Sequence, residues 1–192
     1  MAKQRHGAWI QTFTGIQFWP MDARPEEVEI LDIAHSLSLL CRFNGHCRRF
    51  YSVAEHSVHV SDSVAPEHAL WGLLHDGAEA YIADLPQPIK RHMLEFQAIE
   101  EHLLRVIGQR FGLPLSMPAE VKYADKVLLS TEKSVLMGPE PAPWMTLPPP
   151  LDPVRIQGWE PTEAKQRFLH RFKELVGGDG PEGHHQAVRL RS

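Results

Sequence analysis

The chain has 192 residues, of which 43% are hydrophobic and 23% are charged, and its formal net charge is -4. This length fits one domain with its own core, and an acidic balance argues against a dedicated nucleic-acid binder, which would usually carry a basic face. Two cysteines and a start without a signal-peptide pattern favour the cytoplasm, and no stretch approaches the roughly 20 apolar residues of a membrane span. Twelve histidines are the unusual count, and those between His35 and His75 carry most of the information.

The first 28 residues or so show no helical periodicity. Gly15 and Pro20 interrupt this segment, and it contains several aromatic side chains, among them Phe18 and Trp19. So many aromatic residues in a non-periodic segment indicate that it packs on the rest of the protein. We therefore predict an irregular N-terminal arm or a short hairpin.

The rest of the chain has helical periodicity, with Ser52 as the N-cap of one helix and Glu55 three residues later. A proline-rich segment, PEPAPWMTLPPPLDPV, precedes the last helix and is too rich in proline for helix or central strand. We predict an all-α fold, with a single domain over 1–177 (core 28–137) and a disordered tail over 178–192. The expected helices are about 25–41, 53–64, 66–82, 91–111, 118–137 and 161–176.

Adjacent His75 and Asp76 are the central chemical feature. They lie in an otherwise apolar stretch, ALWGLLHDGAEAYI. Burying both side chains is costly unless something pairs with them, and a metal ion does so through imidazole nitrogen and carboxylate oxygen. The alternative is a helix surface on which the pair faces solvent.

Further polar residues in apolar surroundings favour the metal. His56 and His59 lie one turn apart on the preceding helix, and Asp125 interrupts the buried stripe of VKYADKVLL, where aspartate is a poor helix former. Glu79 falls one helical turn after the His-Asp pair, and Asp84 follows at the helix end. These residues indicate a metal site with acidic neighbours.

In this order the residues resemble the signature of the HD-domain phosphohydrolases, which is a histidine, then His-Asp on the next helix, then a distant aspartate. The resemblance covers about 28–137 and is closest to bacterial 5'-deoxynucleotidases and small phage-type enzymes that hydrolyse deoxynucleoside triphosphates such as dATP. The shared strings are RF from Arg42, VAEHS from Val53, HDGAE from His75 and DLPQPIK from Asp84. The resemblance implies an HD-domain helical bundle with one divalent ion, Mn, Co, Zn, Ni or Fe, and magnesium on the substrate phosphates as a further option. Its ligands would be His56, His75, Asp76 and Asp125.

The resemblance also implies roles for neighbouring residues. Glu79 would position or deprotonate the attacking water, and Asp84 would act as a second acid-base group or support the site from outside. Arg42 and Lys90 would hold phosphate oxygens, although each could instead be a solvated surface charge. The loop around Ala65 is shorter than in the deoxynucleotidases, so this part of the pocket is expected to differ.

A nucleotide pocket also needs an apolar wall for the base. We expect the arm to fold over the site, with Trp19 or Phe18 near the base and with Pro86 and Pro88 crowding the sugar, which would disfavour a 2'-hydroxyl. The alternative is that both aromatic residues only fix the arm to the helices.

Two rival metal sites are weaker. His35 could replace His56 as the first ligand, but VAEHS matches the family position better. Cys41, Cys47 and His46 lack the second pair of ligands that a structural zinc site needs.

The sequence thus predicts a metal-dependent phosphohydrolase of (deoxy)nucleotides. The alternatives are an HD phosphodiesterase acting on another phosphoester and a non-enzymatic nucleotide-binding module. The expected partners are a small-molecule nucleotide and further copies of the chain, since the aromatic arm, the proline-rich segment and Trp144 are apolar for a free surface. No nucleic acid or membrane partner is expected.

Overall fold

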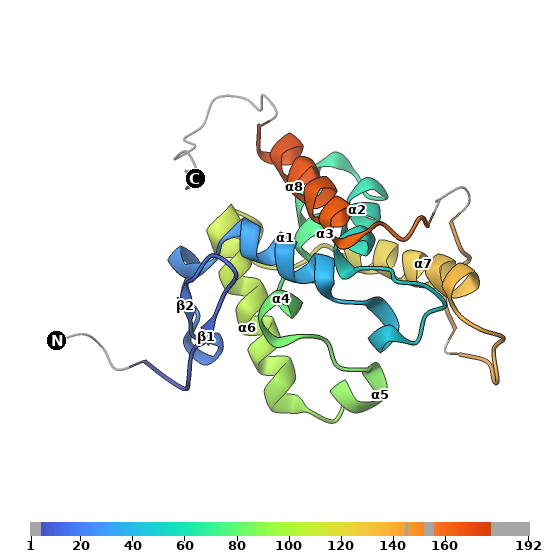
Figure 1. Cartoon of the computed structure of the whole chain (residues 1–192), viewed down its shortest axis with the longest axis horizontal. Helices are drawn as coiled ribbons and strands as arrows, with labels where there is room; N and C mark the ends of the chain where they lie inside the picture. The colour runs from blue at the N-terminus through green and yellow to red at the C-terminus, as the bar shows by residue number, and fades with distance from the viewer. Residues whose placement is uncertain (1–4, 145, 152–155, 178–192) are drawn as a thin grey trace.

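The structure is a computed structural model of the chain, and it describes residues 5–144, 146–151 and 156–177. Helices dominate, as predicted for an all-α fold (Figure 1). They are α1 Ile30–Leu39, α2 Val53–Asp62, α3 Ala69–Leu74, α4 Glu79–Ile82, α5 Gln87–Lys90, α6 Leu94–Phe111, α7 Ala119–Leu136 and α8 Pro161–Gly177. The predicted tail 178–192 lies outside the described residues.

The N-terminal arm is a two-stranded antiparallel hairpin followed by two short 3-10 turns. Strand β1 (Ile10–Gln11) pairs with β2 (Gln17–Phe18), with Ile10 opposite Phe18. Phe18 is fully buried and stacks on Tyr81, with ring centroids 4.0 Å apart, so this residue fixes the arm to the helices. The predicted irregular arm is confirmed.

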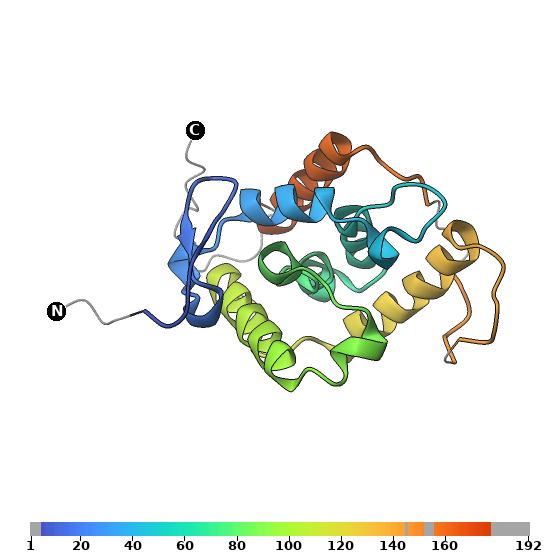
Figure 2. The same ribbon diagram turned by 60° about the horizontal axis from the view of Figure 1, so that its bottom comes forward.

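Helix α2 is the central element of the bundle. It packs against α1, α3, α7 and α8, and its residues from Val53 to Val58 are all buried. The Ser52 side chain accepts a hydrogen bond of 3.1 Å from the Glu55 backbone N–H, which confirms the predicted N-cap. Both views place the hairpin and α7 at opposite ends of the molecule, with α2 and α3 between them (Figures 1 and 2).

The predicted continuous helix over 66–82 is wrong. In the structure, this segment begins with a 3-10 turn at Pro66–His68, which is followed by α3. Helix α3 ends at Leu74, residues 75–78 form turns, and α4 begins at Glu79. The Gly77 N–H bonds to the Leu74 carbonyl, three residues back instead of four. A side chain at position 77 would lie 3.0 Å from that carbonyl oxygen, so glycine permits the tight turn. The chain therefore leaves the helix where the His-Asp pair lies.

The other elements follow the prediction closely. Helices α6, α7 and α8 begin and end within about three residues of the expected bounds, whereas the first helix is shorter because residues 25–27 form a 3-10 turn. The described part of the proline-rich segment contains no helix or strand. Within the described residues, no helix is long and apolar enough to cross a membrane.

Candidate metal centre

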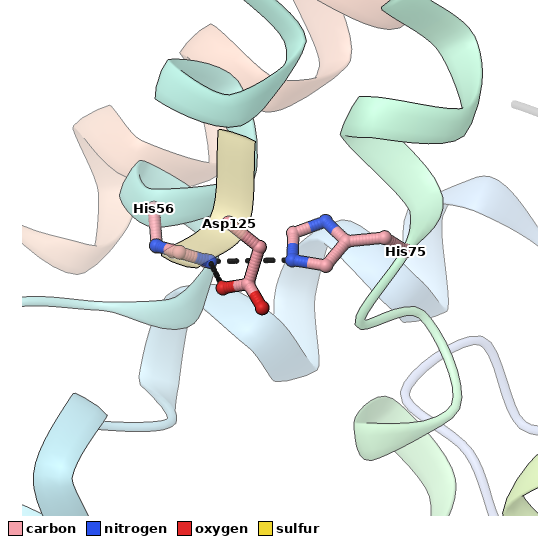
Figure 3. Close-up of side chains that lie close together, drawn as sticks. All are labelled: His56, His75 and Asp125. Atoms are coloured by element: carbon pink, nitrogen blue, oxygen red, sulfur yellow. Dashed lines mark hydrogen bonds and ion pairs between the residues drawn. The ribbon is translucent and has the colours of Figure 1, made fainter. Parts of the chain in front are cut away.

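Three side chains from separate segments meet inside the bundle, His56 of α2, His75 just after α3 and Asp125 of α7 (Figure 3). The His56 Nε2 atom lies 3.2 Å from His75 Nε2 and 3.2 Å from Asp125 Oδ1. Both histidines are buried, whereas the Asp125 side chain is 39% exposed. The cluster is therefore reached from solvent on the side of the aspartate.

Hydrogen bonds to the outer ring nitrogens fix both histidines. His75 Nδ1 lies 2.7 Å from the Gly72 carbonyl oxygen, and His56 Nδ1 lies 2.5 Å from Glu132 Oε1. These oxygens only accept, so each Nδ1 carries the proton and each Nε2 keeps its lone pair when the ring is neutral. This is the arrangement in which metal-binding histidines are usually held.

Asp76 lies against both imidazoles. Its Oδ2 atom is 3.2 Å from His75 Nε2 and 3.7 Å from His56 Nε2, and it is buried without a hydrogen-bond partner among the described residues. Burial raises the pKa of this carboxyl, but the positive charges of His75, His56 and Arg42 together lower it by more. The pKa of Asp76 is therefore well below 3.8. An ionised buried oxygen without a partner fits a fourth ligand beside the three-residue cluster.

These donors fit a divalent transition metal. Two imidazole nitrogens with carboxylate oxygens suit Zn, Mn, Fe, Co or Ni. Without such an ion, burial and Arg42 lower the pKa of His56, but Glu132 and Asp125 raise it to about 9. The acidic groups thus stabilise a cation at the position of His56 Nε2.

Arg42 lies at the edge of the cluster, in the 3-10 turn Arg42–Gly45. Its Nη2 is 3.0 Å from Glu132 Oε2, and its Nη1 is 3.6 Å from Asp76 Oδ2. Burial lowers the pKa of the guanidinium, but Glu132, Asp76 and Asp125 raise it above its usual value. The arginine is therefore a fixed positive charge beside the proposed metal position, and no longer a candidate for a solvated surface residue.

A second acidic cluster contains Glu79, Asp84 and Glu100, each offering an oxygen within 4.8 Å of the others. The Lys90 ammonium lies 3.2 Å from Asp84 and 2.5 Å from Glu100. Burial, Asp76 and Asp84 raise the pKa of Glu79 well above 4.5. The predicted acid-base residues and the predicted phosphate lysine thus lie together, and Glu79 is close enough to Asp76 for the charge of Asp76 to raise its pKa.

Other predicted site residues lie elsewhere. Trp19 follows β2 in the arm, where the Arg5 guanidinium stands 5.3 Å from its ring centroid. Its companion Phe18 is a core residue, so the role of fixing the arm is the one the structure supports. Pro88 is exposed in α5.

The rival ligands also lie outside the cluster. His35 stacks on Phe13, with ring centroids 3.7 Å apart, and His59 packs against Trp159. The Cys41 and Cys47 sulfurs lie 3.4 Å apart as free thiols. Among the described residues, none of these joins a group able to hold a metal.

Sequence reasoning missed Glu132, although its position carried a signal. It lies seven residues after Asp125, which is two helical turns along the same face of α7, and it is fully buried. A charged residue on the buried stripe of an amphipathic helix is the pattern that had already identified Asp125.

No family model matches the chain. It is 38% identical over 170 residues to the uncharacterized protein YfdR of Escherichia coli (strain K12), which covers 88% of this chain and 96% of that protein. It is 30% identical over 188 residues to the uncharacterized protein RCAP_rcc00048 of Rhodobacter capsulatus, with the same coverage of 88% and 96%. Both similarities extend over nearly the whole length of the relatives.

Proposed function

The chain belongs to the family of the Escherichia coli protein YfdR, and we propose that it is a metal-dependent phosphohydrolase of the HD type acting on (deoxy)nucleotides. The observation that carries the proposal is the meeting of His56, His75 and Asp125 within 3.2 Å contacts beside the buried Arg42. A cation site next to a fixed guanidinium suits a phosphate group, because the two positive charges can share its oxygens.

The proposed metal ligands are His56, His75, Asp76 and Asp125. When bound, the ion supplies Lewis acidity to a phosphoryl group and favours ionisation of water near neutral pH. The exposed side of Asp125 is where substrate and water would enter. A structural site would be closed on all sides.

The other side chains have roles that follow from their charge and place. Arg42 would bind and orient a phosphate, as a planar fork that already has one edge fixed by Glu132. Glu79 would take the proton of the attacking water, since a buried carboxyl with a raised pKa is suited to proton transfer. Lys90, with its partner Asp84, would place a second positive charge for a phosphate chain.

The test combines metal analysis with a phosphate-release screen. Protein stripped by chelator is reloaded with Mn, Co, Ni, Zn, Fe or Mg and offered deoxy- and ribonucleoside mono- and triphosphates and cyclic nucleotides. We expect one metal per chain and release of phosphate or triphosphate. His75→Ala should lose both, whereas His59→Gln, one turn from His56 on α2, should keep both.

Glu79→Gln separates an enzyme from a binding module. It should keep the metal and nucleotide binding but lower turnover by about 100-fold or more. Wild-type protein that binds metal and nucleotide without hydrolysing any of them would be a binding module, and cleavage of cyclic nucleotides alone would make it a phosphodiesterase. Full metal content in His75→Ala would show that the ligands are misassigned.

A further inference from the structure

Glu132 connects two parts of the site that the proposed function treats separately. It is fully buried on α7, and its carboxylate accepts three hydrogen bonds. Oε1 lies 2.5 Å from His56 Nδ1 and 2.8 Å from the Tyr51 hydroxyl, and Oε2 lies 3.0 Å from Arg42 Nη2. One oxygen thus faces the metal-binding histidine and the other faces the arginine.

We infer that Glu132 is a positioning residue that sets both the metal affinity of His56 and the phosphate affinity of Arg42. The inference rests on the proposed function for the role of Arg42, but its metal half requires only that the cluster binds a cation. No other residue in the described part of the chain contacts both side chains through charged hydrogen bonds.

The contact with His56 decides which ring nitrogen is free. Because Oε1 accepts a hydrogen bond from Nδ1–H, the lone pair of the neutral ring lies on Nε2, the atom that faces His75 and Asp125 (Figure 3). A carboxylate in this position also makes the imidazole a stronger donor to a metal, and loss of such a partner typically costs 10–100-fold in metal affinity.

The contact with Arg42 fixes one end of a guanidinium that comes from a tight, irregular turn. Phe43 and Asn44, which follow it, have left-handed backbone angles (φ 55° and 52°), an uncommon conformation outside glycine. Glu132 holds Nη2, whereas Nε is buried without a partner among the described residues. Nη1, which lies 3.6 Å from Asp76 Oδ2, is not used by Glu132 and is the donor left for a phosphate oxygen.

The charges agree with this double role. The carboxylate lies beside the Arg42 guanidinium through Oε2 and beside the His56 ring through Oε1, so one negative charge serves both partners. The competing explanation is that Glu132 only satisfies the polar groups of the core. That explanation predicts a loss of stability from any break in the network, without a specific effect on metal or phosphate.

Two substitutions of Glu132 and one control distinguish the explanations. Glu132→Gln keeps the volume but turns one oxygen into an NH2 group, so it cannot accept from both His56 and Arg42. Glu132→Asp keeps the buried charge but shortens the reach, which guards against a variant that does not fold. Tyr51→Phe removes the third hydrogen bond and leaves the other two.

The first measurement is metal affinity without substrate, by competition with a chromogenic chelator for Zn²⁺ or Co²⁺. Folded Glu132→Gln or Glu132→Asp should bind 10–100-fold more weakly than wild type, whereas Tyr51→Phe should stay within about threefold of wild type even if it melts earlier. Wild-type affinity in a folded Glu132 variant would overturn the inference. Metal affinity is measured without hydrolysis. A failure of this inference can therefore be distinguished from a failure of the proposed function.

The second measurement is the affinity for inorganic phosphate at saturating metal, by equilibrium dialysis. We expect a loss of about tenfold or more in the Glu132 variants, because Arg42 is no longer held, and a similar loss in Arg42→Gln without weaker metal binding, since that variant removes a positive charge beside the metal position. Unchanged phosphate binding in the Glu132 variants, with weakened phosphate binding in Arg42→Gln, would remove Arg42 from the inference. A parallel loss of both affinities in Tyr51→Phe would show that the effect is only structural.

Discussion

Glu79 is the residue whose surroundings most directly constrain the proposed chemistry. It is 6% exposed at the start of α4, and its burial is the main reason for its raised pKa. Asp76 and Asp84 raise the pKa further, whereas Arg42 and Lys90 lower it by less. A base must be ionised to accept a proton, so activity should rise with pH as Glu79 loses its own proton.

The charged neighbours of Glu79 therefore predict the acidic limb of the pH profile. Asp84→Asn removes a negative charge and should move the acidic limb of kcat/KM to lower pH, whereas Lys90→Met removes a positive charge and should move it to higher pH. The measurement is kcat/KM over pH 4–9 at saturating metal. Burial raises the pKa of Glu100 and its contact with Lys90 lowers it, so Lys90→Met raises the pKa of Glu100 as well as that of Glu79. Shifts in the same direction, or an unmoved limb, would assign the limb to another group.

The sequence predicted the metal residues better than the residues that support them. His56, His75 and Asp125 could be found because polar residues in apolar helical stripes need a reason, and their order resembles a known signature. The role of Glu132 could not be predicted, because glutamate is common on helices and its partners Arg42 and His56 lie 90 and 76 residues away in the sequence. Hydrogen bonds between distant segments leave no local pattern.

At the scale of elements, the break after α3 shows the limit of periodicity. The apolar spacing of residues 69–82 continues through the break, so the sequence predicts one helix. The turn depends on the hydrogen bond from Gly77 to Leu74 and on the His75 ring bonded to Gly72, which are tertiary details of the site. The same few residues therefore end the helix and orient the His75 ring toward the cluster.

Glu55 has a structural role that its capping position did not reveal. It is fully buried on α2, and it accepts hydrogen bonds from the backbone N–H groups of Gln157, Gly158 and Trp159 at 3.0, 3.0 and 2.6 Å. These bonds hold the segment that leads into α8. The carboxylate therefore fastens the last helix to the centre of the bundle.

This contact predicts a large effect on stability from Glu55→Gln. One oxygen becomes an NH2 group facing backbone donors, so unfolding by urea should show a loss of about 1–3 kcal/mol. Glu163→Gln is the control, since it breaks only an exposed pair with Arg167 on α8 and should change little. Equal stability of Glu55→Gln and wild type would mean that the hydrogen bonds from residues 157–159 to Glu55 do not stabilise the fold.

For the whole molecule, composition and periodicity were sufficient to predict an all-α bundle with an arm and a proline-rich segment. They could not show where the arm lies, because its contacts, such as Phe18 on Tyr81, join residues distant in sequence. The views place this arm away from α7, which carries Asp125 and Glu132 (Figures 1 and 2). The expected place of Trp19 over the base therefore has no support from this arrangement.

The arm nevertheless keeps the apolar surface that led to the prediction of a homo-oligomer. Trp9 and Phe13 are 50% and 55% exposed, and Leu39 of α1 is 55% exposed. Phe13 and Leu39 line the same hollow between the hairpin, α1 and α4. Large exposed apolar side chains grouped in this way are typical of protein interfaces.

We therefore expect at least a dimer by light scattering at micromolar concentration, formed through this surface. Leu39→Asp places a charge in the hollow and should reduce the mass to that of one chain, because burying an unpaired carboxylate is costly. Leu115→Asp is the matched control, since Leu115 is 81% exposed in the segment before α7 and outside this hollow. A single-chain mass for the wild type would refute the assembly, and a dimer that survives Leu39→Asp but not Leu115→Asp would move the interface to the segment between α6 and α7.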